Sequence, residues 1–372
     1  MRGLYLHIPF CDGKCPYCDF YSLAADDSIK EEYTRCLEAQ LAHWAEKMSA
    51  QGDSLQADTL YFGGGTPNLL GANRLARLIH AAKRYFSLKD AEITVEVNPS
   101  SLLDAFFCEL YQAGANRLSI GLQSANDAEL KALGRRHTAS QAAQTVQAAR
   151  AAGFSNISLD LMLATPGQTM ESALHSVQFC AELGVPHVSA YLLKVEEGTP
   201  YWERKDSLVL PDEDETADRY LAVCEALEKA GLKQYEISNF AHPGKESRHN
   251  LKYWRGEEYL GLGPGAHSFI NGQRFYYPRS LSDFLKAPQP IVDGEGGSLE
   301  EAVMLGLRLT EGITAQKLAV FGDEGERAFV QIEKKSRPYR KAGLLVSEPG
   351  RIAMTPKGFL VSNELIAELL PE

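Results

Sequence analysis

Long hydrophobic runs are absent from this sequence of 372 residues. A membrane-spanning helix needs about 18 or more predominantly apolar residues in a row. Glu, Asp, Lys or Pro interrupts every candidate stretch of that length. The apolar stretch within residues 1–9 is too short for the hydrophobic core of a signal peptide. We therefore expect a cytoplasmic protein, and the sequence leaves peripheral contact with a membrane open.

Basic residues are fewer than acidic residues. Lys and Arg number 38 and Asp and Glu number 49, which gives a formal net charge of −11. Non-specific binding to nucleic acid depends mostly on Lys and Arg, so we expect no nucleic-acid partner. The chain is 44% apolar and 23% charged, which excludes disordered and collagen-like classes and allows a large core. Its length predicts two or so domains.

Cysteine is scarce and unevenly placed. There are seven cysteines, an odd number that cannot pair completely within the chain. Three of them, Cys11, Cys15 and Cys18, are crowded together, which favours a metal or catalytic cluster in a reducing compartment over a disulfide framework. The other four occupy apolar positions of predicted helices, and we expect them to be buried as small hydrophobic side chains: Cys36, Cys108, Cys180 and Cys224.

Short aliphatic runs alternate with helical patterns through the first 200 residues. The predicted strands are 4–8, 59–62, 93–97, 117–120, 157–161 and 188–193, and the predicted helices are 28–50, 71–86, 101–113, 138–152 and 170–183. Repeated strand–helix units predict right-handed crossovers and a parallel sheet. Six units are too few for a closed eight-stranded barrel, so the pattern favours an α/β fold built as a partial, open (β/α)6 barrel.

Three domains are predicted along the chain: a partial barrel at 1–200, a barrel extension at 201–290, and a C-terminal domain at 291–372. An acidic segment at 211–215 predicts the start of a helix that continues to about Lys229. Pro and Gly predict a linker at 287–298. The last domain should be mainly helical and resemble a winged helix, with a small hairpin near 344–354 as its wing.

The cysteine cluster, Cys-x-x-x-Cys-x-x-Cys, directly follows the first predicted strand. A structural zinc site normally has four ligands, and His7 could complete such a site. The alternative is a 4Fe–4S cluster held by Cys11, Cys15 and Cys18. Four thiolates are the usual ligand set of such a cluster, so three from the protein leave one iron open to another ligand.

This cysteine spacing, with Tyr17 before the last Cys, resembles the radical SAM superfamily. The resemblance covers roughly residues 1–200 and implies that S-adenosylmethionine binds the open iron. It also implies an electron donor, which the sequence does not identify.

Further polar motifs follow successive predicted strands, where the residues of a barrel site converge. They resemble the coproporphyrinogen-oxidase-like branch of the superfamily through the strings at 5–11, 63–67, 116–123 and 159–162. The resemblance implies that eight residues line the S-adenosylmethionine pocket: Tyr5, Gly64, Gly65, Thr66, Glu96, Gln123, Arg135 and Asp160.

Two features separate the members of this branch. Anaerobic coproporphyrinogen oxidases carry a further Cys where this chain has Phe20, and they have an N-terminal extension before the first strand, which we do not expect here. Instead, residues 249–254 form an H-N-x-x-Y-W string that resembles the HemW-type haem chaperones. His249 is a candidate haem ligand, and His242 nearby is a second candidate. Tyr253 and Trp254 could stack on a porphyrin.

The resemblance therefore implies a haem chaperone that delivers haem to respiratory or other haem proteins, with little or no coproporphyrinogen oxidation. The alternative is an oxygen-independent coproporphyrinogen III oxidase, so whether the chain is an enzyme stays undecided. The role of His249 as a haem ligand is also undecided, because a single His is more often a buried residue with hydrogen bonds in the core. The sequence leaves homodimer formation open as well.

Overall fold

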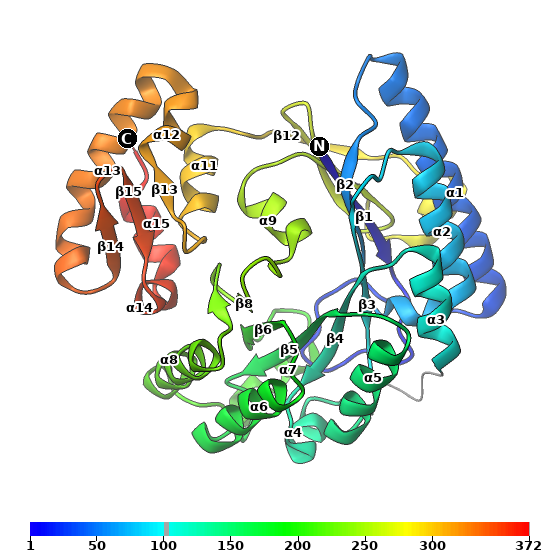
Figure 1. Cartoon of the computed structure of the whole chain (residues 1–372), viewed down its shortest axis with the longest axis horizontal. Helices are drawn as coiled ribbons and strands as arrows, with labels where there is room; N and C mark the ends of the chain where they lie inside the picture. Colours follow the sequence, from blue (N-terminus) through cyan, green and yellow to red (C-terminus); the bar gives the residue numbers. More distant parts are fainter. Residues whose placement is uncertain (100–103, 372) are drawn as a thin grey trace.

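The computed structural model describes residues 1–99 and 104–371. Figure 1 shows a strongly curved sheet with helices on its outer side, and a smaller domain, coloured orange to red, at one edge of the molecule. The predicted start of a helix at residue 101 lies outside the described residues.

Six parallel strands in sequence order form the centre of the sheet. They are β1 (Arg2–Ile8), β2 (Ala57–Gly64), β3 (Glu92–Val97), β4 (Arg117–Gln123), β5 (Asn156–Leu163) and β6 (His187–Leu192). The crossover helices are α1 (Asp27–Ala50), α2 (Ala72–Tyr85), α3 (Asp104–Ala113), α4 (Asp127–Ala132), α5 (Ala139–Ala151) and α6 (Met170–Glu182). The predicted strand–helix alternation is therefore confirmed, apart from the short helix α4, which was not predicted.

The two faces of this sheet differ in polarity, with a period of two residues along each strand. Apolar side chains face the outer helices and are buried; examples are Leu60 and Phe62 on β2. The alternate positions carry polar side chains toward the concave interior, such as Glu96 on β3 and Asp160 on β5. Successive side chains of a strand point to opposite faces, so this alternation produces an apolar core outside the sheet and a polar interior within it.

Polar caps start the helices that cover the sheet. The Asp26 side chain accepts a hydrogen bond from the backbone N–H of Ile29 at the start of α1, at 2.9 Å. Thr138 and Gln141 form a reciprocal capping box at the start of α5. Such side chains satisfy backbone N–H groups that have no partner within the helix.

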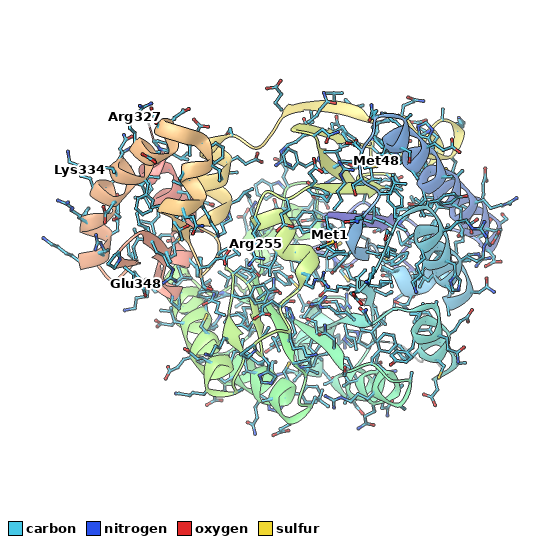
Figure 2. All side chains as sticks on the ribbon, turned by 45° about the horizontal axis from the view of Figure 1, so that its top comes forward. Met1, Met48, Arg255, Arg327, Lys334 and Glu348 are labelled. Carbon is cyan, nitrogen blue, oxygen red and sulfur yellow. The ribbon has the colours of Figure 1, made fainter. Side chains whose placement is uncertain are left out.

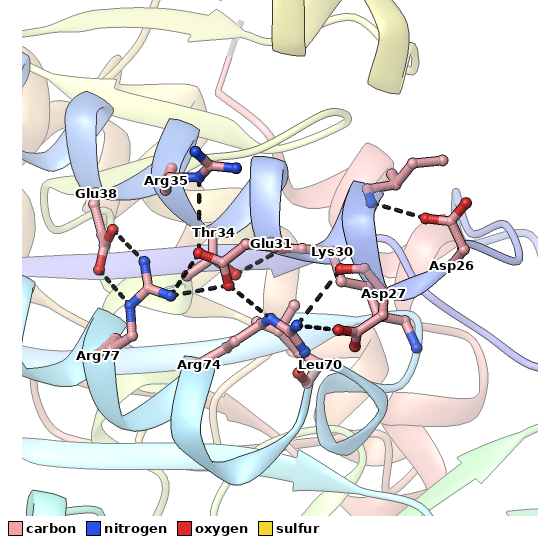
Figure 3. Close-up of polar contacts among 11 residues, drawn as sticks. Asp26, Asp27, Lys30, Glu31, Thr34, Arg35, Glu38, Leu70, Arg74 and Arg77 are labelled. Atoms are coloured by element: carbon pink, nitrogen blue, oxygen red, sulfur yellow. Dashed lines mark hydrogen bonds and ion pairs between the residues drawn. The ribbon is translucent and has the colours of Figure 1, made fainter.

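Ion pairs join α1 to α2 on the outer surface (Figure 3). Arg77 pairs with Glu38 and Glu31, each at 2.8 Å. Arg74 pairs with Asp27 at 2.7 Å and with Glu31 at 3.1 Å. Glu31 therefore bridges two arginines, and the network links the neighbouring helices α1 and α2.

Additional strands extend the sheet at both ends, so it is larger than the six strands predicted. Beside β1 lie β9 (Tyr259–Leu262), which is parallel to it, and then the antiparallel strands β10 (His267–Ile270), β11 (Gln273–Tyr276) and β12 (Ile291–Glu295). Beside β6 lie β8 (Asn239–Ala241) and β7 (Lys233–Gln234). The predicted linker at 287–298 was wrong in part, because β12 pairs with β11 within it.

Between β6 and the additional strands, the chain forms α7 (Pro200–Glu203), α8 (Glu213–Lys229) and α9 (Arg248–Trp254). The predicted helix ending at Lys229 is confirmed as α8. Helix α9 carries the H-N-x-x-Y-W string and lies on the concave side of the sheet, near the centre of Figure 1. It packs against the amino-terminal ends of β2 and β3, where Thr59 and Glu92 contact its first turn.

After α10 (Leu281–Lys286) and β12, the C-terminal domain begins. It contains α11 (Leu299–Gly306), α12 (Ala315–Leu318), α13 (Gly322–Lys341), α14 (Pro356–Leu360) and α15 (Ser362–Leu369). Its small sheet pairs β15 (Arg351–Met354) with β13 (Ile313–Thr314) and β14 (Leu345–Glu348), which confirms the predicted hairpin.

The C-terminal domain is joined to the barrel extension through backbone as well as side chains. Ile237 N–H donates to Arg308 C=O at 3.0 Å, and Thr310 N–H donates to Tyr235 C=O at 3.1 Å. Arg255, labelled between the two parts in Figure 2, pairs with Glu311 at 3.3 Å. Arg327, Lys334 and Glu348 mark the opposite, outer side of the domain in the same view.

The cysteines outside the cluster differ partly from prediction. Cys180 and Cys224 are buried as expected, but Cys36 is only half-buried and Cys108 is exposed. Cys108 lies on the outer side of α3, because the apolar positions of that helix that face the core are Phe107, Leu110 and Ala113. Among the residues described, no helix is long and apolar enough to cross a membrane.

Candidate functional site

A cavity of about 730 Å³ opens at the carboxyl-terminal ends of the parallel strands. Its wall includes most of the residues singled out in the sequence: Cys11, Cys15, Cys18, Gly64, Gly65, Thr66, Glu96, Gln123, Arg135 and Asp160. Residues at or just after the ends of all six parallel strands line it, because parallel strands all end at the same edge of a sheet.

The three cluster cysteines lie in the loop between β1 and α1 and have free, partly exposed thiols. Thr66 Oγ1 donates to Cys11 Sγ at 3.6 Å, and Arg135 Nη1 donates to Cys15 Sγ at 3.7 Å. Within the described residues, no three His, Cys, Asp or Glu side chains converge as ligands of one metal ion. Each thiolate of a 4Fe–4S cluster binds a different iron, so such a cluster needs no point common to all three sulfurs.

The glycine motif brings backbone close to the cluster loop. Gly64 has a φ of 111°, a region that favours glycine, and a Cβ on Gly65 would lie 2.6 Å from the carbonyl oxygen of Phe10. Gly65 N–H donates to Ile8 C=O at 2.9 Å, and Thr66 N–H donates to Phe10 C=O at 2.8 Å. Any side chain at residue 65 would push the glycine motif away from the cysteines.

Glu96 lies on the cavity wall beside the glycine motif. Its carboxylate accepts hydrogen bonds from Tyr61 Oη at 2.8 Å and from Gly64 N–H at 3.3 Å. Burial raises the pKa of Glu96 to about 7, and the Tyr61 hydrogen bond opposes this rise. Near neutral pH this carboxyl group can therefore gain or lose its negative charge, and its attraction for a cationic ligand changes accordingly.

Arg135 is held in place by groups that the sequence did not single out. Its Nη2 donates to Asn98 Oδ1 at 2.6 Å and to Gly121 C=O at 3.1 Å. Asn98 in turn donates through Nδ2 to Thr66 Oγ1 at 2.9 Å. These contacts connect the segment after α4, the residue after β3 and the glycine motif. The position of Asn98 immediately after a predicted strand was the feature that could have identified it.

Gln123 ends β4 with a φ of 70°, which is uncommon for a residue other than glycine. The pairing register between β4 and β5 shifts between Ile120 and Gln123. Irregular pairing of this kind redirects side chains and is frequent next to active sites. Here it occurs where Gln123 lines the cavity.

The floor of the cavity carries opposite charges. Asp160 accepts a hydrogen bond from Ser119 Oγ at 3.0 Å, and burial raises the pKa of this carboxyl group. Arg117, at the start of β4, is almost fully buried and lines the same cavity. Its Nε has no hydrogen-bond partner within the described part of the chain. The sequence did not identify Arg117, because it begins β4, whereas the predicted site residues were sought at the carboxyl-terminal ends of the strands.

The residues of the H-N-x-x-Y-W string occupy a different place. His249 is buried; its Nδ1 lies 2.7 Å from Thr59 Oγ1 and its Nε2 lies 2.8 Å from Tyr253 Oη. Its ring stacks on Tyr61 with the centroids 5.0 Å apart. Burial lowers the pKa of His249 to about 3, so the imidazole is neutral.

Neither His249 nor Tyr253 lines the cavity, and Trp254 faces Arg308 of the C-terminal domain, 5.9 Å from its ring. Asn250 is the residue of the string that reaches the cavity wall. Tyr5 also lies below the cavity, with its Oη 3.0 Å from His7 Nδ1. The structure therefore gathers ten of the predicted residues around the cavity and leaves Tyr5, His249, Tyr253 and Trp254 outside it.

Comparison with known proteins gives two matching families. The radical SAM superfamily matches residues 5–180, and the HemN C-terminal domain matches residues 298–361. The chain is 37% identical to "Heme chaperone HemW" of Mycobacterium tuberculosis over 99% of this chain and 94% of that protein. It is 34% identical to the protein of the same name from Bacillus subtilis over 100% of both chains.

Among solved structures, the coproporphyrinogen III oxidase HemN of Escherichia coli, described as a radical SAM enzyme, has a TM-score of 0.82. The match covers 99% of this chain and 89% of that one at 23% identity. At this identity the similarity concerns the fold alone.

Proposed function

Because this chain belongs to the HemW family of the radical SAM superfamily, we propose that it is a haem chaperone that binds haem and transfers it to haem-requiring proteins. The observation that carries this proposal is the similarity to proteins named heme chaperone HemW along the full length of the chain. Phe20 supports it, because the oxidases of this branch have a cysteine at that position. Coproporphyrinogen oxidation is not favoured.

Three thiolates and the glycine motif suit the cofactors of this superfamily. Cys11, Cys15 and Cys18 would hold a 4Fe–4S cluster, whose fourth iron is open to S-adenosylmethionine. The cluster supplies a single electron when it is bound and reduced. Gly64 and Gly65 allow backbone to approach the methionine group, and Glu96 offers an acceptor to its ammonium. Gln123, Arg135 and Asp160 complete the polar wall of the cavity.

His249 belongs to the proposal as a candidate haem ligand. Its two ring nitrogens contact Thr59 and Tyr253, so the imidazole can bind iron only after one of these contacts is broken. Tyr253 and Trp254 would then be the neighbouring aromatic side chains. A His249→Ala variant that binds haem with an unchanged Soret maximum and affinity would exclude His249 as the ligand.

The proposal is tested by titrating anaerobically reconstituted protein with haem and recording the Soret band. We expect saturable binding. We also expect transfer of bound haem to an apo-haem protein that is mixed with the chain and then separated from it by an affinity tag. In parallel, coproporphyrinogen III is incubated with the protein, dithionite and S-adenosylmethionine. Robust decarboxylation together with no haem binding would instead support the oxidase alternative.

A Cys15→Ala variant serves as the control for the cluster. We expect it to lose most of its iron and sulfide after reconstitution, because each thiolate binds its own iron. Full iron content in this variant would contradict the assignment of the cluster.

The proposal has four further parts: respiratory haem proteins as acceptors, an electron donor, contact with a membrane surface and homodimer formation. Pull-down with apo-acceptors, vesicle flotation and sedimentation test them separately.

A further inference from the structure

We propose that haem docks at the mouth of the cavity, between the cluster loop and the end of β6. The apolar faces of the porphyrin would contact Phe20, Tyr191 and Leu192, and its propionates would face Lys194 and Arg279. This inference rests on the proposed haem chaperone function and assigns the surface that contacts the porphyrin.

Three large apolar side chains are exposed on the lining of this one cavity. Phe20 is 66% exposed, Tyr191 is 41% exposed and Leu192 is 36% exposed. Single exposed hydrophobic residues are common on protein surfaces and need no explanation. A group of them at the entrance of a cavity is different, because such groups mark sites where an apolar ligand or partner is bound.

The positions of these residues follow from the fold. Phe20 lies in the cluster loop that follows β1, whereas Tyr191 and Leu192 end β6. β1 and β6 are the first and last of the six consecutive parallel strands, so four strands separate them in the sheet. The exposed apolar side chains therefore come from two separate parts of the lining of one cavity, which suits a flat ligand with two apolar faces.

Cations on the same lining complement the two propionates of haem. Lys194 pairs with Glu196 at 2.7 Å, and Arg279 pairs with Asp19 at 3.5 Å. The side chains of Lys194 and Arg279 are 80% and 61% exposed, and exposed ion pairs contribute little to stability. Either cation can therefore exchange its present carboxylate for a propionate at small cost.

Access also favours the cavity mouth as the first contact. A porphyrin at the mouth can contact four side chains without breaking any buried contact: Phe20, Leu192, Lys194 and Arg279. His249 by contrast is buried beneath the cavity with both ring nitrogens in contact with other side chains. Docking at the mouth is thus a separate event from iron ligation, and the two respond to different substitutions.

The first test compares haem affinity by Soret titration of reconstituted protein. We expect Leu192→Ser to weaken binding and the double variant Phe20→Ser/Leu192→Ser to weaken it at least about tenfold, since both side chains lose apolar contact with the ligand. Val209→Ser is the matched control: Val209 is 78% exposed but does not line the cavity. Iron content and binding of S-adenosylmethionine identify any variant whose site has not formed.

The outcomes separate the two proposals. Absence of saturable haem binding by the wild-type chain overturns the proposed function. Wild-type binding together with equal affinity in a double variant that retains its iron overturns the docking site alone. Leu192→Ser, outside the cluster loop, keeps the test decisive if Phe20→Ser impairs the cluster.

The second test addresses the propionates by comparing haem with its dimethyl ester. We expect the wild-type chain to prefer free haem, and the Lys194→Gln/Arg279→Gln variant to lose most of this preference. The control is Lys205→Gln/Arg204→Gln, which removes two cations that do not line the cavity. An unchanged preference in the Lys194→Gln/Arg279→Gln variant would contradict the assignment of the cations.

Discussion

At the scale of single residues, Glu96 is the group whose charge is most sensitive to pH in the cavity. Burial raises its pKa from 4.5 to about 7, although Tyr61 and the backbone of Gly64 both donate hydrogen bonds to the charged form. A raised pKa in the folded state means that neutral Glu96 favours folding. This contribution is complete below pH 4.5 and is lost as the pH rises through about 7. Ligand binding has the opposite requirement, because cationic S-adenosylmethionine needs the carboxylate.

We therefore predict that affinity for S-adenosylmethionine falls as the pH is lowered from 8 to 6. Below the pKa of Glu96, the dissociation constant should rise by up to about tenfold per pH unit, since only the ionised fraction binds. Equilibrium dialysis of reconstituted protein measures this change. Glu96→Gln should bind weakly at all pH values, and Tyr61→Phe should move the midpoint upward because it removes a hydrogen bond to the charged form. The same pH dependence in Glu96→Gln would contradict the assignment.

At the scale of elements, α9 closes the concave side of the sheet beneath the cavity. Its His249 contacts Thr59 and Tyr253 and stacks on Tyr61, and the backbone N–H of His249 donates to Glu92 at 3.1 Å. Lys252, one turn later, is buried and pairs with Asp58 at 2.8 Å. The short helix is therefore held by contacts with the sheet, because a helix of this length is not stable by itself.

We predict that His249→Ala lowers the free energy of unfolding by about 2–4 kcal/mol, through an unfilled volume and a buried hydroxyl without its partner. Urea unfolding monitored by circular dichroism measures the effect. His43→Ala on the exposed side of α1 is the control and should change stability by less than about 0.5 kcal/mol. If His249→Ala were as stable as the wild type, the structural role of α9 would be refuted.

At the scale of the whole molecule, the C-terminal domain is part of one folded unit with the barrel extension. The segment from Tyr235 to Ile237 exchanges backbone hydrogen bonds with residues 308–310. Glu236 and Leu309 form a β-bridge there, and both residues are buried. Helix α14 also packs against α8 of the extension.

We predict that a chain ending at residue 297 is less stable than the full chain and has a lower midpoint of thermal unfolding. Each lost backbone hydrogen bond costs about 1 kcal/mol, and Leu309 and its neighbours no longer cover the extension. Differential scanning calorimetry measures the shift. As a control, removal of residues 371–372 alone should leave the midpoint unchanged. Two separate transitions in the full chain, with the first part unaffected by truncation, would show that the domains fold independently.

Local sequence determined the secondary structure and the cofactor motif. The predicted strands and helices of the first 200 residues occur because hydrophobic periodicity, caps and glycine at helix ends act within a few residues. The cysteine spacing predicted a cluster loop because all three thiols belong to one short segment. The order of polar motifs after successive strands was sufficient to predict that Glu96, Gln123, Arg135 and Asp160 converge on one cavity.

Tertiary structure decided what depends on contacts distant in sequence. Arg117 joined the site because strand alternation turns it to the concave interior. Asn98 joined it through hydrogen bonds with Thr66 and Arg135, which are distant in sequence. His249 was separated from the cavity because α9 packs below it against strands that lie about 150 or more residues earlier in the chain. Phe20 was informative in the sequence only as a missing cysteine. The fold gives it a physical setting, since its ring is exposed on the lining of a cavity that also includes the end of β6.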